Sequence, residues 1–213
     1  MNRFSESKGL KIVLLVSVCL LAAGGGIRSC VATIKPPTQA SYPGEQRVTS
    51  TIRSGESLDI RTLGTDVLVR IGDSSSELVA EVQGNRTTNH QLQVHQDGST
   101  WTITFRPSWN PVSFNSGSGN APLIVTIPAG LILEDISITT ISGDISVENS
   151  LETTDSATFK TTSGDIRLAG LNTEKAEVKS VSGIIQIHSL STDRMEATTV
   201  SDRIEMEEIS PKF

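Results

Sequence analysis

The C-terminal third of the chain contains four similar segments, and this repetition constrains the fold more than any other feature. The repeats span residues 136–151, 157–171, 176–190 and 195–209, and successive turn serines are separated by 21, 19 and 19 residues. Each repeat alternates apolar and polar residues around a Ser-Gly-Asp-like turn, which predicts a strand, a tight turn and a second strand. Because so short a repeat cannot bury its own apolar face, the repeats must stack.

Superposition of the repeats places apolar residues in columns that predict the core. Parallel strands stacked about 4.8 Å apart bring like residues together and form a β-solenoid. A polar column of hydroxyl residues is predicted to form a ladder along the stack. The apolar columns are Ile138/Phe159/Val178/Ala197, Ile145/Ile166/Ile185/Ile204, Val147/Leu168/Ile187/Met206 and Leu151/Leu171/Leu190/Ile209, and the polar column is Thr140/Thr161/Ser180/Thr199.

Glycine occupies the turn of the first three repeats, at Gly143, Gly164 and Gly183. Glycine adopts a positive φ without steric cost, so these residues are predicted to be structural turn residues with φ above zero. Asp144 and Asp165 follow two of these glycines and would lie about 5 Å apart in stacked strands. A calcium site is one interpretation of this pair. Aspartate is also an ordinary turn residue, and on that interpretation no metal and no cofactor is predicted.

The region before the repeats is also rich in strand patterns. Residues 58–69, LDIRTLGTDVLV, have the strand–turn–strand pattern and are interpreted as a degenerate first repeat. Between them and residue 136, the sequence predicts further strands in a hairpin-like, antiparallel arrangement. Residues 107–121 are rich in Pro, Ser, Asn and Gly and predict a mobile surface loop. The predicted fold is all-β: a parallel β-solenoid continuous with an antiparallel β region.

The N-terminus has the pattern of a membrane segment. Residues 12–27 contain no charge and follow a basic stretch, which predicts that the chain after them faces away from the cytoplasm. The predicted organisation is a cytoplasmic stub (1–11), a transmembrane anchor or uncleaved signal (12–30), a linker (31–47) and an extracytoplasmic domain (48–213). Cleavage near Cys30 and lipidation at Cys30 are the alternatives.

The charge balance bears on possible partners. Residues 31–213 carry 14 basic and 23 acidic residues, so this part of the chain is acidic. An acidic surface repels phosphate backbones, and the chain has no basic stripe, so nucleic acid is not an expected partner. The expected partners are the membrane, through the N-terminal helix, and an envelope protein or cell-wall polymer. The pattern leaves the oligomeric state open.

Few residues suggest a site for chemistry. His90, His95 and His188 have no spacing typical of a catalytic or metal site, and the chain is predicted not to be an enzyme. Trp101 and Trp109 stand out among the few aromatic residues and suggest a possible interaction surface, such as a carbohydrate platform. Alternatively, Trp101 packs beneath the hairpin and Trp109 covers an open end of the solenoid.

Three stretches carry a resemblance to a known family. LDIRTLGTDVLV, then LIVTIPAGLILEDISITTISGDISV, then repeated SGDI-like turns resemble the bacterial putative-adhesin domain of unknown function, which includes LiaG-like membrane-anchored envelope proteins. The similarity spans residues 48–210. It implies a β-solenoid-like domain, often behind a membrane segment, and it supplies no catalytic residues. The chain departs from the pattern at Ile184 and at Ser201-Asp202-Arg203.

These observations lead to one main functional hypothesis and two alternatives. The main hypothesis is a membrane-anchored, extracytoplasmic β-repeat module, an adhesin or scaffold that binds an envelope protein or wall polymer. The first alternative is an accessory protein that regulates a cell-envelope stress response, as the resemblance to LiaG-like proteins suggests. The remote alternative is an envelope hydrolase.

Overall fold

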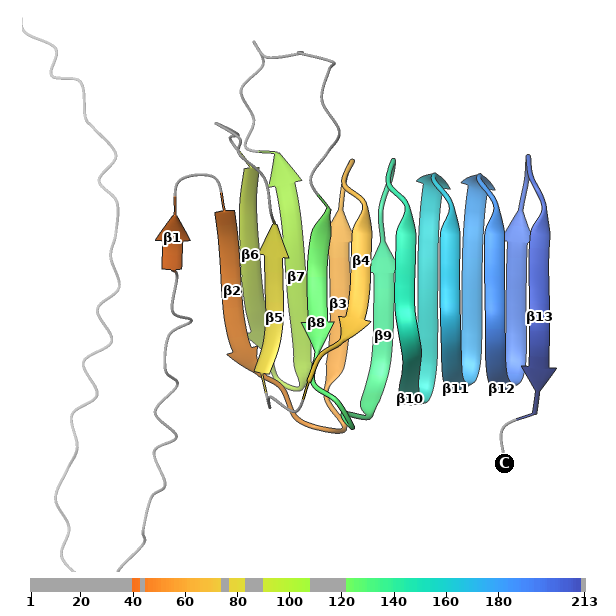
Figure 1. Ribbon diagram of the computed structural model, residues 1–213, viewed down its shortest axis with the longest axis horizontal. Coiled ribbons are helices and arrows are strands. Elements are labelled where there is room, and N and C mark those ends of the chain that lie inside the picture. The colour runs from red at the N-terminus through yellow and green to blue at the C-terminus, as the bar shows by residue number, and fades with distance from the viewer. Residues whose placement is uncertain (1–39, 43–44, 74–76, 83–89, 108–121, 212–213) are drawn as a thin grey trace, which may run out of the picture. The chain divides into compact units, whose positions relative to one another are not determined.

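All the regular structure is β. The computed structural model describes residues 40–42, 45–73, 77–82, 90–107 and 122–211, and none of them is helical (Figure 1). The predicted membrane segment, most of the linker and residues 108–121 lie outside these ranges. The described strands form a 13-stranded sheet. They are β1 (Ala40–Tyr42), β2 (Glu45–Thr51), β3 (Ser57–Thr62), β4 (Val67–Ile71), β5 (Glu77–Val82), β6 (His90–Asp97), β7 (Thr100–Pro107), β8 (Leu123–Ile127), β9 (Leu133–Thr139), β10 (Ile145–Ser163), β11 (Ile166–Ser182), β12 (Ile185–Thr199) and β13 (Ile204–Ser210).

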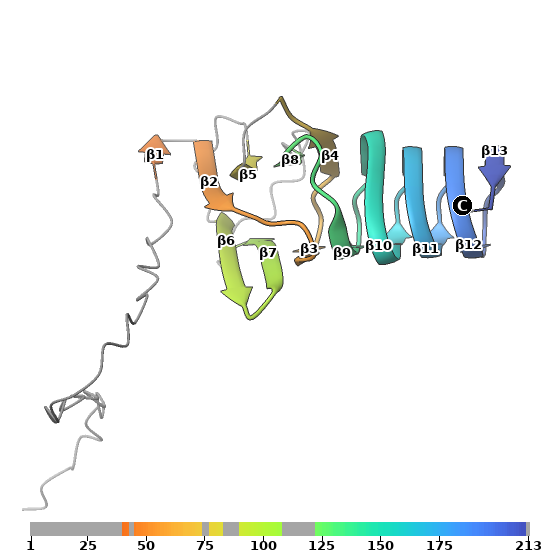
Figure 2. The ribbon, with the colours of Figure 1, turned by 90° about the horizontal axis from the view of Figure 1, so that it is seen from below.

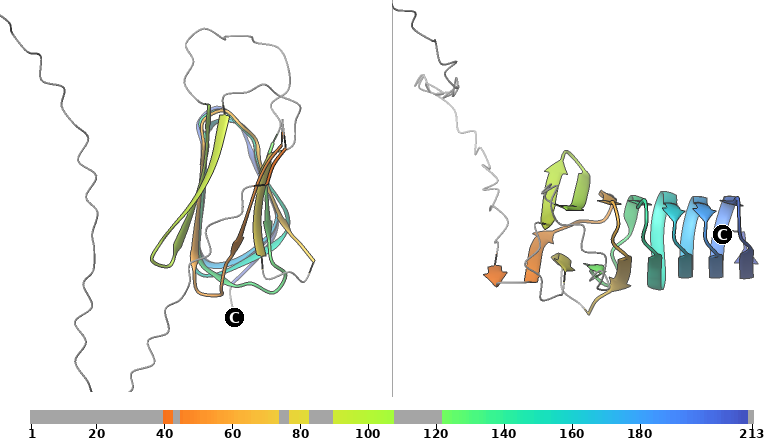
Figure 3. Two further views of the ribbon diagram at one scale, coloured as in Figure 1. Left: turned by 90° about the vertical axis from the view of Figure 1, so that its left-hand side faces the viewer. Right: turned by 90° about the horizontal axis from the view of Figure 1, so that it is seen from above.

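The predicted repeats form a parallel stack from β9 to β13. The second strand of each repeat runs into the first strand of the next, so β10, β11 and β12 are 19, 17 and 15 residues long. Each of these strands bends around a corner of the solenoid, and Figure 3 shows successive repeats superposed around one elongated ring. The pairing confirms the predicted register of every apolar column; for example, Phe159 lies between Ile138 and Val178.

The interior of the stack is packed with the predicted apolar columns. Phe159, Ile145, Ile166 and Leu151 are fully buried. Burying a side chain of this size contributes about 1.5–3 kcal/mol to stability, and alternation along each strand directs these residues inward. The columns therefore supply the hydrophobic core that a single repeat lacks.

Burial fails in the last repeat, where the sequence predicts the same core. Ile204 and Ile209 are 37% and 55% exposed, and Ala197 and Met206 are only partly buried. The physical reason is that β13 pairs only with β12 among the described strands, so no further repeat covers these side chains. The prediction that Ile204 and Ile209 belong to the core is wrong, although their register is right, and Met206 still packs against the core.

The degenerate first repeat is confirmed, and further strands continue the stack beyond it. The parallel pairs β3–β9 and β4–β10 place Leu58 beside Ile136 and Val67 beside Ile145. β7 and β8 then pair in parallel with β3 and β4. The predicted antiparallel arrangement holds only for β1–β2, β2–β5, β5–β8 and β6–β7. Figure 2 shows β6 and β7 as a hairpin beside the stack.

Two walls of the solenoid enclose the core. One wall, called the groove wall because a shallow groove lies on its outward face, comprises β8, β4, the first halves of β10, β11 and β12, and β13. The opposite wall comprises β7, β3, β9 and the second halves of β10, β11 and β12. The Ser-Gly-Asp turns connect the opposite wall to the groove wall.

Candidate functional site

The glycines of the turns are required by close stacking of the backbone. A Cβ on Gly164 would lie 2.1 Å from the carbonyl oxygen of Gly143, and a Cβ on Gly183 would lie 1.9 Å from that of Gly164. Positive φ occurs at Gly55, Gly98 and Gly130 but not at Gly143, Gly164 or Gly183. The predicted positive φ is therefore wrong at these turns, although glycine is indeed needed there, because one turn lies directly against the next.

The aspartates of the turns form a ladder along the stack. The Oδ1 atom of Asp66 accepts a hydrogen bond from the backbone N–H of Asp144 at 2.9 Å. Asp144 accepts one from Asp165, and Asp165 accepts one from Ile184, each at 2.9 Å. The second carboxylate oxygens of Asp144 and Asp165 accept hydrogen bonds from Arg167 at 3.1 and 2.5 Å. These bonds give both calcium candidates a structural role in the turns.

The predicted polar column bonds to carbonyl groups instead of forming a hydroxyl ladder. Thr161 and Ser180 donate to the carbonyl oxygens of Gly143 and Gly164 at 3.1 and 3.0 Å. Thr199 does the same to Gly183 at 3.1 Å. A hydroxyl–hydroxyl contact does occur at the opposite corner, where buried Thr153 donates to Thr173 at 2.7 Å.

The sequence analysis missed this second corner. Thr153, Thr173 and Thr192 are all buried and come from successive repeats at spacings of 20 and 19 residues. Thr192 donates to the carbonyl oxygens of Glu174 and Arg194 at 3.1 and 3.0 Å, which satisfies backbone groups where the strands bend. The signal was present in the sequence as a threonine that recurs at the repeat period.

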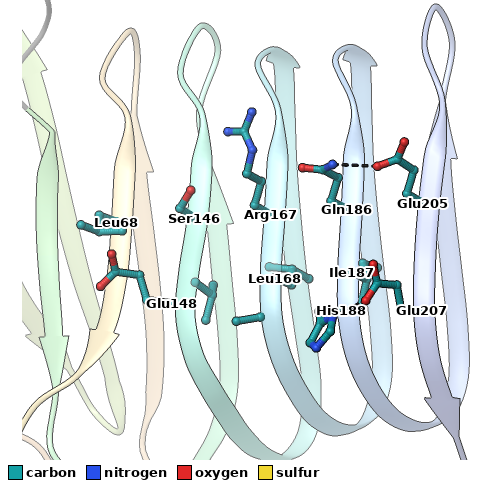
Figure 4. A pocket seen from close by; sticks show the side chains of 12 residues that line it. Leu68, Ser146, Glu148, Arg167, Leu168, Gln186, Ile187, His188, Glu205 and Glu207 are labelled. Atoms are coloured by element: carbon teal, nitrogen blue, oxygen red, sulfur yellow. Dashed lines mark hydrogen bonds and ion pairs between the residues drawn. The ribbon is translucent and has the colours of Figure 1, made fainter.

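A shallow groove lies on the outward face of the groove wall (Figure 4). It has a volume of about 420 Å³ and crosses from β4 to β13. The strand register places Ala169 of β11 in one outward row with Glu148 of β10 and His188 of β12. The side chain of Ala169 is shorter than its two neighbours in this row. The groove is lined by Leu68, Ser146, Val147, Glu148, Arg167, Leu168, Ala169, Gln186, Ile187, His188, Glu205 and Glu207.

The groove has an excess of negative charge. Its carboxylates are Glu148, Glu205 and Glu207, and its one arginine, Arg167, is already paired with turn aspartates. Hydrogen bonds from Gln186 and Arg203 lower the pKa of Glu205, so this carboxylate stays ionised. A surface with this charge attracts cationic groups, and its walls hold carboxylates at fixed positions.

The outward face of the opposite wall carries balanced charges. Glu177 accepts from Lys160 and Lys179, both at 2.8 Å, and Lys179 also pairs with Glu196 at 2.7 Å. Hydrogen bonds with Glu177 and Glu196 raise the pKa of Lys179 to about 12. This alternating row of charges neutralises itself, in contrast to the groove.

The aromatic candidates do not form an exposed platform in the described part of the chain. Trp101 is 9% exposed and packs in the core beside β3, and its Nε1 donates to Glu56 at 2.7 Å. The packing interpretation of Trp101 is therefore confirmed, and its interpretation as an interaction surface is wrong. Trp109 lies outside the described residues.

The histidine side chains that the structure describes, His95 and His188, are not assembled into a reactive centre. His188 is exposed on β12 and hydrogen-bonds to Glu207 of β13, whereas His95 is exposed on β6. The side chain of His90 lies outside the described set. Among the described residues, no three His, Cys, Asp or Glu side chains are grouped in a way that would hold a metal ion. Within the described ranges, no helix is long and apolar enough to span a membrane.

The sequence that forms these walls and turns matches the model of a known protein family. The family model Toastrack DUF4097 matches residues 56–212, which include both walls and every Ser-Gly-Asp-like turn. The chain belongs to this family. No curated protein is significantly similar to the chain.

Solved structures are similar to this chain at low sequence identity. A putative cell adhesion protein from Clostridium sporogenes has a TM-score of 0.54 at 8% identity, covering 77% of this chain and 99% of that one. A putative adhesin from Bacteroides fragilis has a TM-score of 0.36 at 15% identity, with 79% and 97% covered. A putative lipid binding protein from Parabacteroides distasonis has a TM-score of 0.22 at 14% identity, with 78% and 96% covered. At these identities, the first of them supports the fold alone.

Proposed function

We propose that this Toastrack protein is an adhesin-like interaction module that is held at the outer side of a membrane and binds an envelope protein or wall polymer through its groove wall. The observation that carries the proposal is the acidic groove of about 420 Å³ on a rigid stack of parallel strands. Because the strands are in register, the groove holds its carboxylates at fixed positions, with Glu148 on β10 and Glu205 and Glu207 three strands away on β13, about 14 Å at the usual strand spacing. Such a face suits a long partner that carries repeated cationic or hydrogen-bonding groups.

The chemistry of the groove supports binding over catalysis. Its groups contact one another: Gln186 donates to Glu205 at 2.7 Å, and His188 bonds to Glu207. An acyl- or phosphoryl-transfer site instead aims a nucleophile, a base and an oxyanion donor at a common point. The name of the Clostridium sporogenes structure agrees with a binding role.

The tether is proposed from the N-terminal sequence. Residues 12–27 carry no charge and follow Arg3, Lys8 and Lys11, which directs the following domain to the non-cytoplasmic side. Protease treatment of intact cells tests this placement. Digestion of the domain without lysis is the expected result, and protection until the membrane is opened would contradict it.

Site-specific photo-crosslinking in living cells tests the groove. The photoreactive residue replaces Gln186, on the groove wall, or Lys160, on the opposite wall, in otherwise identical full-length proteins. We expect a product from Gln186 and little from Lys160. A discrete heavier band would indicate an envelope protein, and a broad smear would indicate wall polymer. Equal products from both walls, or none from Gln186, would overturn the proposal that the groove wall is the binding face.

A further inference from the structure

The groove wall ends at β13 with backbone groups that continue a regular series. At each level of the wall, a backbone N–H donates to the next strand: Val67 to Asp144 at 2.8 Å, Ile145 to Asp165 at 2.8 Å and Ile166 to Ile184 at 2.9 Å. The last bond of the series joins the N–H of Ile185 to the carbonyl of Arg203 at 3.1 Å. By the same geometry, the N–H of Ile204 points away from β12, and no described strand pairs with β13 on that side.

The apolar columns end uncovered at the same place. Ile145 and Ile185 are completely buried, whereas Ile204 in the same column is 37% exposed. Ile209 is 55% exposed, although its paired neighbour Leu190 is buried. An added strand with apolar residues facing inward would extend these columns by one step and remove this surface from water.

The contacts between successive strands show which side chains such a strand would carry outward. Along the stack, carboxylates face cations or donors: Lys175 pairs with Asp155, Gln186 with Glu205 and Lys179 with Glu196. β13 itself has three glutamates, Glu205, Glu207 and Glu208, and no lysine or arginine. Two of them have partners outside β13, since Glu205 accepts from Gln186 and Arg203, and Glu207 bonds to His188. Arg203 offsets one of the three glutamates, so the edge keeps an excess of negative charge that basic residues on a next strand complement.

We propose that β13 is a docking edge for an extended, basic segment of a partner protein, which adds to the sheet as one further strand. The segment alternates apolar residues, which cover Ile204, Met206 and Ile209, with lysine or arginine, which face the glutamates. Pairing of β13 with β13 of a second copy is disfavoured, because it brings like charges together. The inference rests on the proposed function in that it names one class of partner, and it adds the backbone edge and the open apolar columns of β13 to a groove that Glu205 and Glu207 also line.

Peptide binding to the full-length protein tests the side chains. The probe is a fluorescent heptapeptide in which lysine and valine alternate, and its control has the same composition with the lysines grouped at one end. We expect the alternating peptide to bind at least tenfold more tightly than the grouped one, and more weakly at high salt. The double variant Glu205→Lys/Glu207→Lys should lose at least tenfold in affinity. Glu77→Lys/Glu134→Lys, which changes the net charge equally at exposed sites on β5 and β9, should bind within twofold of the unchanged protein.

A second pair of variants tests the backbone. Ile204→Pro removes the outward N–H at the first residue of an edge strand, where proline is tolerated, and should weaken binding at least fivefold. Ile204→Val keeps the N–H and should leave binding unchanged. Circular dichroism and thermal unfolding of each variant show whether the fold is retained.

The outcomes separate this inference from the proposed function. Equal binding of the two peptides, or loss of binding only with net charge, would mean nonspecific attraction and would overturn the inference. Absence of binding, or a concentration-dependent dimer that Ile204→Pro abolishes, would also overturn it. Because Glu205 and Glu207 also line the groove, the backbone variant separates the two proposals: loss of peptide binding in Ile204→Pro with crosslinking from Gln186 retained supports the edge, whereas absence of crosslinking from Gln186 in the unchanged protein counts against the groove wall.

Discussion

The repeat stack, from β9 to β13, and the mixed region, from β2 to β8, bury apolar side chains in one hydrophobic core, but their strands are connected differently. In the repeat stack, neighbouring strands come from successive repeats about 20 residues apart, such as Ile145 beside Ile166. In the mixed region, Leu58 pairs with Ile136 in parallel, and β5 inserts antiparallel between β2 and β8. The same strand register can therefore arise in two ways: between successive sequence repeats, or between strands that lie far apart in the sequence.

The turns of the two regions differ in whether the backbone of a preceding turn crowds them. In the repeat stack, each glycine lies against the carbonyl of the preceding turn, whereas Thr65 occupies the equivalent position in the first repeat. A Cβ at Gly143 would lie 2.3 Å from the Thr65 carbonyl, so crowding begins only after this turn. The glycine requirement therefore comes from the preceding neighbour and not from the turn itself.

The largest expected effect comes from the center of the repeat stack. Phe159→Ala removes a fully buried ring between Ile138 and Val178 and should lower the free energy of unfolding by about 3–5 kcal/mol. In a Trp109→Phe background, Trp101 fluorescence reports on the mixed region and circular dichroism on all strands. Both urea transitions should shift together, because β10 pairs with β4 and β9 as well as with β11.

Separate transitions would show that the two regions unfold independently, as repeat arrays do when coupling between units is weak. Ile204→Ala is the matched control at the open end of the stack. Its partial exposure should limit the loss to about 1 kcal/mol. An equal loss from the two variants would contradict the open end.

The turn glycines should give the next largest difference. Gly164→Ala places a Cβ 2.1 Å from a backbone carbonyl oxygen and should destabilise the protein by about 1–3 kcal/mol through overpacking. Gly64→Ala, in the turn of the first repeat, meets no atom within 4 Å and should change stability by less than about 0.5 kcal/mol. Thermal unfolding measures both. A tolerated Gly164→Ala would refute close stacking as the reason for glycine.

The column of hydroxyl residues that contains Thr140 and Thr161 crosses the boundary between the regions. Replacing the two threonines with valine should change the free energy of unfolding differently. Thr161→Val removes a bond to the Gly143 carbonyl and should cost about 1 kcal/mol. The buried Thr140 hydroxyl has no hydrogen-bond partner among the described residues, and Thr62 donates to the Thr65 carbonyl, which is equivalent to that of Gly143. Thr140→Val should thus be neutral or stabilising in chemical denaturation. A cost equal to that of Thr161→Val would mean that Thr140 is satisfied.

The smallest expected effect is the charge row on the opposite wall. Hydrogen bonds from Lys160 and Lys179 lower the pKa of Glu177 in the folded protein. A lowered pKa stabilises the fold above the unfolded-state value, and this contribution is lost as the pH falls through the folded-state value. Glu177→Gln should cost less than about 1 kcal/mol at pH 7. Urea titrations should show the difference shrinking in acid and in high salt, and a pH-independent difference would exclude this origin.

How far the sequence predicts the fold depends on the distance between pairing residues. The columns from Ile138 to Met206 were predictable because each repeat presents the same alternation at nearly constant spacing. The parallel pairing of β3 with β7, and of β4 with β8, was not, because no repeat relates these segments and the alternation fits either strand direction. The turn aspartates were identified, but their bonds to the next turn depend on stacking.

The sequence by itself determined the all-β class, the repeat register and the residues that face the core, because alternation and period are local properties of the chain. The tertiary structure decided the order of the strands in the mixed region, the need for glycine at the turns and the burial of Trp101. It also assembled the acidic groove from outward residues of different repeats and left the ends of the apolar columns open at β13. These features depend on which neighbour a strand has, and neighbours are set by packing in three dimensions.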